Sequence, residues 1–255
     1  MTAHVRLWFS RTRSCATSTT TVRGLLTFLA GVASFCFSTA SSAEVGATLS
    51  VYSDVRFRGY SLSDGRPAVF VDLSYDDPKG FYAAVSGSAS LTGQGQIRPL
   101  ALELNAGYTK RTTSGLTLDM GIDHSDYARP SSVGPGTSYT AAYAGLSYKF
   151  LSSRIYLSPH YFGGGATTAY SELNANFSPA RLWSIDGHVG LLVPLNGMRG
   201  SEGSRSEYDW RIGATRSIGR VSLRAAWTAG GPRDDDYLDL AHSKNALVFG
   251  LVYSL

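Results

Sequence analysis

The chain has 255 residues, only 16% of them charged, and a formal net charge of +4 from 23 Lys and Arg against 19 Asp and Glu. This length suits one large domain or two small ones. No run of about 18 uncharged apolar residues follows the N-terminal region, so the composition excludes internal transmembrane helices.

The N-terminal region is predicted to be a secretory signal peptide. Four arginines precede an uncharged, largely apolar run at residues 24–40, and small residues follow at 41–43, where a signal peptidase reads the chain. We therefore expect residues 1–43 to be removed by cleavage after Ala43. Residues 44–255 would then form the mature protein.

Cleavage would change both the charge and the cysteine content. The removed part holds four arginines and no acid, so the mature chain keeps 23 − 4 = 19 basic residues against 19 acidic ones. Without a net positive charge, nucleic acid is not an expected partner. Cys15 and Cys36 also leave, so neither disulfides nor thiolate chemistry is expected in the mature chain.

The mature chain is predicted to consist of β-strands throughout. Apolar side chains at every second position, as at Leu100, Leu102 and Leu104, indicate a sheet whose two faces meet different surroundings. Most of the runs have the length of roughly ten residues that a tilted strand needs to cross a bilayer. There are twelve runs, near residues 45–57, 67–76, 81–91, 100–109, 116–126, 138–150, 154–162, 169–178, 182–195, 207–218, 221–229 and 245–255. The expected fold is all-β, an up-and-down antiparallel transmembrane β-barrel of about 12 strands.

The connections between the runs alternate in length. Those after the even-numbered runs are tight, for example at residues 77–80 and 219–220. Those after the odd-numbered runs are mostly longer and reach 11 residues at 196–206 and 15 residues at 230–244. Short periplasmic turns and longer external loops are typical of outer-membrane barrels. An even number of strands places both termini at the short-turn end.

The aromatic residues favour a membrane barrel over a soluble β-fold, which would turn its apolar face inward. On the apolar face they gather at the strand ends, as girdles at two membrane interfaces do. At the short-turn ends they are Tyr75, Phe81, Tyr108, Tyr148, Phe150, Phe177, Trp183 and Tyr253. At the long-loop ends they are Phe57, Tyr161, Tyr208, Trp210 and Trp227. The sequence therefore predicts a protein of the outer membrane, surrounded by its lipid and lipopolysaccharide.

The polar face would line the lumen and carries more acids than bases. The acids are Asp54, Asp72, Glu103, Asp119, Asp123, Glu172, Asp186, Glu207 and Asp209, and the bases are Arg56, Lys149, Arg211 and Arg224. The candidate selectivity residues of the outer half are Asp54, Arg56, Asp72, Glu103, Asp123, Glu172, Glu207, Asp209 and Arg211. Acids in a confined pore select cations, which predicts a porin-like, cation-preferring channel for passive passage of small solutes or ions.

A second interpretation stays open beside the channel. The same charges could pair across strands and fill a narrow lumen, leaving a structural or surface-interaction barrel that conducts nothing. In the first hairpin, Asp72 should lie opposite or diagonal to Asp54 and Arg56. These three residues could form either a constriction cluster or a structural salt bridge that fixes the hairpin.

No catalytic residue, metal site or other cofactor is expected. The histidines are scattered, without the spacing of zinc ligands. A third interpretation, an outer-membrane lipid hydrolase, would draw on the adjacent pairs His124-Ser125 or His242-Ser243. Adjacent side chains on a strand point to opposite faces, so a His–Ser dyad would need a spacing of two residues.

The first predicted hairpin carries a characteristic string, Ser53-Asp54-Val55-Arg56-Phe57-Arg58-Gly59-Tyr60-Ser61, then Asp64-Gly65-Arg66-Pro67-Ala68, then Gly80-Phe81-Tyr82-Ala83. Over residues 45–90 the chain resembles the TorF family of porin-like proteobacterial outer-membrane proteins. The resemblance implies an outer-membrane channel and supplies no catalytic residues.

The end of the chain resembles another outer-membrane feature. Gly250, Tyr253 and Leu255 are spaced like the C-terminal signal by which outer-membrane proteins engage the barrel-assembly machinery, with Leu255 where Phe is usual. This resemblance implies that the assembly machinery is a partner of the last strand.

Overall fold

A computed structural model describes most of the predicted mature chain, at residues 43–91, 93, 95–128, 137–163, 166–196, 206–231 and 245–255. The predicted signal peptide, apart from its last residue, lies outside the described residues. No helix in these ranges is long and apolar enough to cross a membrane.

The described residues form fourteen β-strands. They are β1 (Glu44–Tyr52), β2 (Arg56–Phe57), β3 (Tyr60–Ser61), β4 (Ala68–Asp76), β5 (Phe81–Leu91), β6 (Ile97–Arg111), β7 (Thr117–Tyr127), β8 (Ser138–Tyr148), β9 (Leu151–Tyr161), β10 (Ala166–Ala180), β11 (Trp183–Asn196), β12 (Glu207–Ile218), β13 (Val221–Gly231) and β14 (Asn245–Ser254). Twelve of them form a closed antiparallel barrel, and β2 and β3 form a separate hairpin. The predicted fold class is confirmed.

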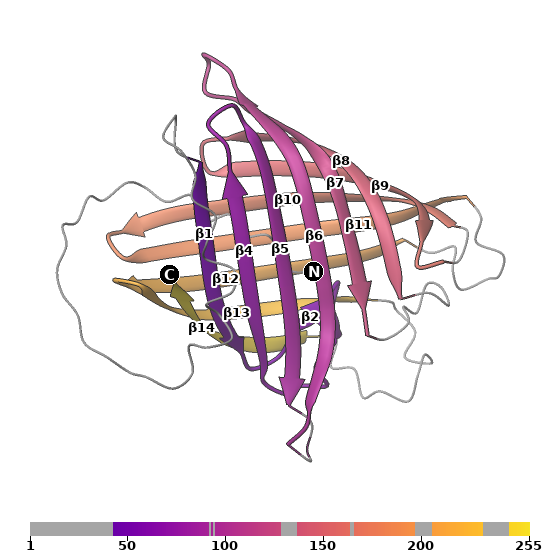
Figure 1. The fold of residues 1–255 in the computed structure, drawn as a ribbon, viewed down its shortest axis with the longest axis vertical. Coiled ribbons are helices and arrows are strands. Elements are labelled where there is room, and N and C mark those ends of the chain that lie inside the picture. Colours follow the sequence, from indigo (N-terminus) through magenta and orange to yellow (C-terminus); the bar gives the residue numbers. More distant parts are fainter. Residues whose placement is uncertain are drawn as a thin grey trace. The chain divides into compact units, whose positions relative to one another are not determined.

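The barrel closes where its first and last strands pair. Each strand pairs with its sequence neighbours, and β14 returns to β1 in a register that joins Thr48 to Ser254 and Tyr52 to Gly250. In Figure 1, β1 and β4–β6 run steeply across one side of the barrel, while β10–β13 cross the other side at a large angle to them. Strands on opposite walls cross in this way because closure requires each strand to tilt against the barrel axis.

Tight turns connect the strands at one end, as the sequence predicts. In the turn after β4, the amide of Gly80 donates to the carbonyl of Asp77 over 2.8 Å, and the Asp77 carboxylate accepts from the Lys79 amide over 2.7 Å. Gly80 has a φ of 101° and a Cβ there would lie 2.2 Å from the carbonyl oxygen of Thr109, so this position requires glycine.

The outer face of the barrel is apolar. Side chains at alternate positions along the strands, such as Leu102, Leu104 and Ile122, are 44–58% exposed, and the residues between them point inward. At the short-turn end, aromatic residues lie among the exposed ones, including Phe81 and Trp183. A soluble protein would bury such a surface, whereas lipid accepts it.

Two aromatic residues assigned to the outer girdle point inward instead, so that part of the prediction is wrong. β1 ends at Tyr52, five residues before the predicted end, and Phe57 is only 8% exposed. Tyr161 is 2% exposed because the pairing of β9 with β10 shifts register between Ala166 and Thr168. The extra residue of such a bulge reverses the side on which later side chains lie.

Candidate channel interior

The connection between β1 and β4 folds into the barrel. We call residues 53–67 the inner segment. Its hairpin joins Phe57 to Tyr60 through Arg58 and Gly59, whose φ angles of 46° and 90° match the positive values of a type I′ turn. Val55, Phe57 and Arg58 are each less than 9% exposed.

The tip of the inner segment reaches the opposite wall of the barrel. The segment starts and ends on the neighbouring strands β1 and β4, and in the closed order of strands β9 and β10 are each five steps from one of them. The guanidinium of Arg58 nevertheless hydrogen-bonds the hydroxyl of Tyr161 on β9 and lies 4.0 Å from the ring centroid of Tyr170 on β10. The inner segment therefore crosses the interior at the long-loop end.

Arg58 lies among aromatic rings, which we call the Arg58 cage: Phe57, Tyr139, Tyr161 and Tyr170. Ring centroids within about 6 Å of a cation attract it, and the other three centroids lie 5.0 to 6.0 Å from Cζ of Arg58. Burial works against the charged form, but the neighbouring tyrosines and Asp209 raise the pKa of Arg58 above its usual value. The caged side chain is therefore a guanidinium cation.

The acids predicted from the sequence face the interior. Glu103, Asp123, Glu172 and Asp209 are 6–8% exposed, and Asp72, Glu207 and Arg211 are half-buried. These six acids and Arg211 lie on five different strands around the wall, so the structure does not gather them at one point. Asp54 and Arg56 lie on the inner segment rather than on a barrel strand.

Asp54 holds the inner segment together. Its carboxylate accepts from Arg56 over 3.2 Å, from Ser61 over 2.5 Å and from Ser63 over 2.9 Å. The prediction that Asp72 lies opposite or diagonal to Asp54 and Arg56 is wrong. Asp72, on β4, is the register partner of Thr48 on β1, and its carboxylate accepts from the hydroxyl of Ser86 over 2.5 Å. The difference arises because β1 ends before Asp54.

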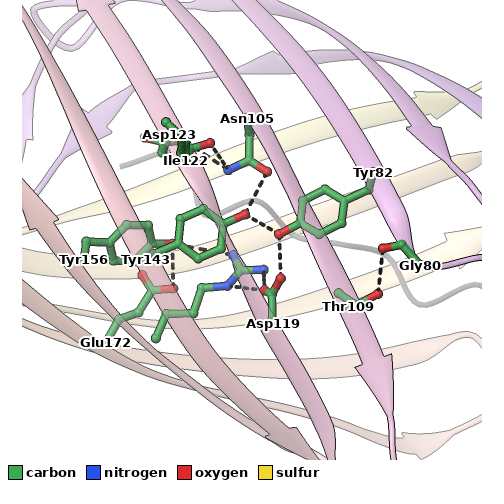
Figure 2. Close-up of polar contacts among 11 residues, drawn as sticks. Gly80, Tyr82, Asn105, Thr109, Asp119, Ile122, Asp123, Tyr143, Tyr156 and Glu172 are labelled. Atoms are coloured by element: carbon green, nitrogen blue, oxygen red, sulfur yellow. Dashed lines mark hydrogen bonds and ion pairs between the residues drawn. The ribbon is translucent and has the colours of Figure 1, made fainter.

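The short-turn half of the interior holds a network between strands β5 and β9 (Figure 2). The hydroxyl of Tyr82 donates to Asp119 over 2.5 Å and contacts the hydroxyl of Tyr143. Tyr143 donates to the side-chain oxygen of Asn105 over 3.2 Å. Arg154 completes the network with an ion pair to Asp119, in which Nε donates over 2.8 Å.

A second polar cluster lies beside the Arg58 cage. Nε2 of His188 lies 2.9 Å from Oδ1 of Asp209, and its Nδ1 lies 2.7 Å from Oδ1 of Asn174. The hydroxyl of Tyr170 donates to Oδ2 of Asp209 over 3.0 Å. The wall behind the cage is therefore fixed by contacts between strands β10, β11 and β12.

The predicted selectivity residue Arg211 belongs to a third cluster. Arg211 donates to Asp186 over 3.2 Å, and Arg224 on the next strand donates to the same carboxylate oxygen over 2.6 Å. One acid thus bridges two arginines, as a structural ion pair in the interior would.

Several interior tyrosines lie over glycines of a neighbouring strand. A Cβ at Gly107 would lie 2.5 Å from the hydroxyl of Tyr82, and one at Gly121 would lie 2.5 Å from that of Tyr143. Gly190 bears the same relation to Tyr170, at 2.0 Å. Each ring covers the space that a glycine leaves on the inward face, so a larger residue at these positions would have to displace its neighbours.

Sequence reasoning missed two of the interior cations. Arg58 lay just beyond the first predicted run, 45–57. Arg154, the first residue of the predicted run 154–162, was not counted among the lumen bases, and β9 begins three residues earlier, at Leu151. Lys149, which was counted, lies in an exposed turn with a φ of 53°. Alternation of Arg154 and Tyr156 with the apolar residues Ile155 and Leu157 was the signal that could have found Arg154.

With these corrections, and apart from the Asp64–Arg98 ion pair at the long-loop mouth, the described interior carries nine acids against five arginines. The arginines are Arg56, Arg58, Arg154, Arg211 and Arg224. The balance of 9 − 5 leaves four more acids than arginines in the interior. The excess of negative charge that the sequence indicates therefore persists in the folded barrel.

The adjacent pair His124-Ser125 does not form a dyad. Ser125 is 2% exposed and donates inward to Asp123 over 3.2 Å, whereas His124 lies 2.9 Å from the hydroxyl of Thr140 on the outer side. The two side chains point to opposite faces of β7. The other pair, His242-Ser243, lies outside the described residues.

Comparison with known proteins gives one family and a set of barrels. A family model described as "Bacterial protein of unknown function (Gcw_chp)" matches residues 37–244. No curated protein sequence matches the chain.

Solved structures share the architecture at low sequence identity. The NanC porin aligns with 83% of this chain and 100% of its own, at a TM-score of 0.54 and 9% identity. The KdgM porin, solved with disordered oligogalacturonate, aligns with 83% and 99% at a TM-score of 0.48 and 9% identity. The COG4313 outer-membrane channel of Pseudomonas putida F1 aligns with 85% and 96% at a TM-score of 0.45 and 10% identity. The chain is thus a closed twelve-stranded barrel with an apolar outer face, and in fold it is like the porins of the bacterial outer membrane.

Proposed function

We propose that this chain, which belongs to the Gcw_chp family of bacterial proteins of unknown function, is a narrow channel for passive passage of small solutes or ions that prefers cations. The observation that carries the proposal is the interior charge, nine acids against five arginines inside a closed barrel. The resemblance of residues 45–90 to TorF proteins supports it, and no catalytic step is part of it.

The charge excess acts strongly because of where it lies. Charges in a tube with low-dielectric walls are screened less than charges on an open surface, so an excess of acids lowers the energy of a cation and raises that of an anion. Glu103, Asp123 and Glu172 are buried on three different strands. They would present negative charge to a passing ion from several directions.

The inner segment would form the constriction of this channel. It crosses the barrel at the long-loop end, from β1 and β4 to the cage on β8–β10. A twelve-stranded barrel is intermediate between eight-stranded barrels, which side chains fill, and sixteen-stranded porins, which leave an aqueous channel. A segment folded across such a lumen would limit passage to small species.

The same segment favours a second candidate, a structural or surface-interaction barrel with a closed lumen. The Arg58 cage at one end and the network around Asp119 at the other both occupy the interior. If the remaining space does not join the two ends, the barrel conducts nothing and its external loops carry the function. Conductance distinguishes the two candidates.

The proposal includes the maturation and the partners of the protein. Residues 1–43 would be the signal peptide, and β1 begins at Glu44, the first residue after the proposed cleavage site. Outer-membrane lipid and lipopolysaccharide would surround the apolar face. The barrel-assembly machinery would receive β14, the strand that closes the barrel.

Planar-bilayer recording of the refolded mature chain tests the proposal. In a salt gradient, the reversal potential of the wild type should indicate cation preference. The triple variant Asp72→Asn, Asp123→Asn, Glu172→Gln keeps polar groups of similar size and removes three interior charges. We expect its reversal potential to move toward the anion side, with unchanged β-content by circular dichroism.

Asp126→Asn is the matched control, because Asp126 lies on β7 near Asp123 but is exposed. It should leave the reversal potential of the wild type unchanged. Absence of any conductance would favour the closed barrel, and an anion-selective wild type would contradict the proposed role of the interior acids.

A further inference from the structure

We propose that the Arg58 cage is a binding site for small organic cations of the guanidinium and quaternary ammonium class, and that Arg58 is a tethered occupant which such a cation replaces. The inference deepens the proposed function, on which it rests for its biological sense, by naming a class of solute. Its basis is the geometry of the cage, the way its walls are held and the way its occupant is held.

The cage offers the contacts that recognise an organic cation. The centroid of Tyr170 lies 4.0 Å from Cζ of Arg58, and those of Phe57 and Tyr161 lie 5.0 and 5.1 Å away. Aromatic faces at these distances attract guanidinium and quaternary ammonium groups through the ring quadrupole. A guanidinium is weakly hydrated and leaves water readily, whereas a compact ammonium or metal ion does not.

Acidic residues add a charge component to the site. Asp209, which accepts from Tyr170, and Glu207 both interact electrostatically with Arg58. The cage therefore combines aromatic faces with negative charge nearby. That combination favours an organic cation over a neutral aromatic molecule, which would gain nothing from the acids.

The walls of the cage are held without the help of Arg58. Tyr170 is fixed by Asp209 over 3.0 Å and lies 3.2 Å from His188. Tyr139 packs on Tyr161 with centroids 4.9 Å apart and on Phe162 at 5.1 Å. Three of the four cage rings belong to barrel strands, so the site should keep its shape when the arginine side chain leaves.

The occupant, in contrast, is held lightly by directional contacts. Its guanidinium donates to the hydroxyl of Tyr161, while its buried Nε has no hydrogen-bond partner among the described residues. Arg58 sits at the tip of a two-residue turn, on a segment that is joined to the barrel at its two ends. A free guanidinium can make the same contacts with the three rings on barrel strands, and its entry would displace the Arg58 side chain from them.

Ligand-observed saturation-transfer NMR on the folded barrel in detergent tests the site directly. The probes are ethylguanidinium and tetramethylammonium, with sodium chloride at the same ionic strength as the reference. Arg58→Ala vacates the cage, and it should bind both probes more tightly than the wild type does. Adding Tyr170→Leu to Arg58→Ala should weaken binding by about 2- to 30-fold, the range expected for one cation–π face.

Tyr52→Leu, added to Arg58→Ala, is the matched control. Tyr52 is an interior tyrosine at the same end of the barrel, but it packs on Phe70 beside the β1–β14 closure. Probe binding should survive this change. Resistance of each variant to SDS before heating shows that it remains folded.

The outcomes separate this inference from the proposed function. Binding to Arg58→Ala that depends on Tyr170 but not on Tyr52 supports the cage as a site, even if the barrel proves not to conduct. If the wild type conducts but Arg58→Ala binds neither probe, the channel stands and the cage proposal fails. Equal binding by the Tyr170→Leu and Tyr52→Leu double variants would also overturn it.

Discussion

The two ends of the barrel interior are built in different ways. At the short-turn end, Tyr82, Asp119 and Arg154 all come from barrel strands and meet because alternation turns them inward. At the long-loop end, Arg58 comes from a segment that leaves the sheet and crosses to the opposite wall. One part of the interior therefore follows from strand geometry, and the other part is supplied by a segment that lies outside the sheet.

The energetic roles of the two ends should differ accordingly. Contacts of the short-turn network join strands two or three steps apart on one wall of the barrel, so they contribute to its stability. Contacts of the inner segment are made across the lumen, and the pairing of Tyr52 with Ala68 closes the β1–β4 hairpin without them. We therefore expect changes in the first region to affect unfolding and changes in the second to affect passage.

The largest effect should follow from removing the inner segment. Replacing residues 54–66 by a short Gly-Ser linker keeps the β1–β4 pairing, since these strands are adjacent and antiparallel. We expect a several-fold rise in single-channel conductance with a barrel that still resists SDS until heated. The same linker inserted in the turn at Gly219 and Arg220 is the control and should leave conductance as it is. Unchanged conductance in the deletion variant would show that the segment is not the constriction.

A smaller effect, on stability, should distinguish two arginines. Arg154→Leu leaves Asp119 buried without its cation, which destabilises a protein by roughly 3–5 kcal/mol. Arg58→Leu removes cation–π contacts worth about 1–2 kcal/mol and leaves Asp209 with its contact to His188. Urea unfolding in lipid vesicles, followed by tryptophan fluorescence, measures both. Equal losses from the two variants would contradict the division between the ends.

The smallest effect concerns the tyrosines that lie over glycines. Gly107→Ala would bring a methyl group within 2.5 Å of both the Tyr82 ring and the Met120 carbonyl oxygen, and we expect a loss of about 1–3 kcal/mol from overpacking. Gly87→Ala, on the neighbouring strand, meets no atom within 4 Å and should change stability little. The same unfolding assay compares the two. A neutral Gly107→Ala would contradict the close packing of Tyr82 and the β7 backbone around Gly107.

Strand geometry explains what the sequence could predict. Alternation placed the twelve barrel strands, mostly within three residues of their ends, because one face meets lipid and the other does not. The inward positions of Glu103, Asp123 and Glu172 follow from the same rule. For these acids on regular strands, alternation alone was sufficient, and it would also have placed Arg154 inward.

The rule failed where the backbone left the strand. Apolar residues continue to alternate through Val55 and Phe57, so the pattern could not tell a lipid-facing strand end from a segment buried in the barrel. The two-residue turn at Arg58 and Gly59 lacks the Asn-Gly or Asp-Gly signal that usually marks such hairpins. At Tyr161 a bulge changed the face, and bulges leave no clear mark in a single sequence.

The chain order of the inner segment bears on how the barrel is assembled. Residues 53–67 come before β7–β11, the strands whose side chains surround their tip, and the seam between β1 and β14 involves the last strand of all. If the sheet forms in chain order from the β1–β4 hairpin, the later strands would therefore close around an inner segment that has already folded. Late insertion would instead require a buried arginine and two aromatic side chains to enter a finished barrel from its mouth. The position of the segment in the chain therefore favours its enclosure during assembly of the barrel over insertion into the finished barrel.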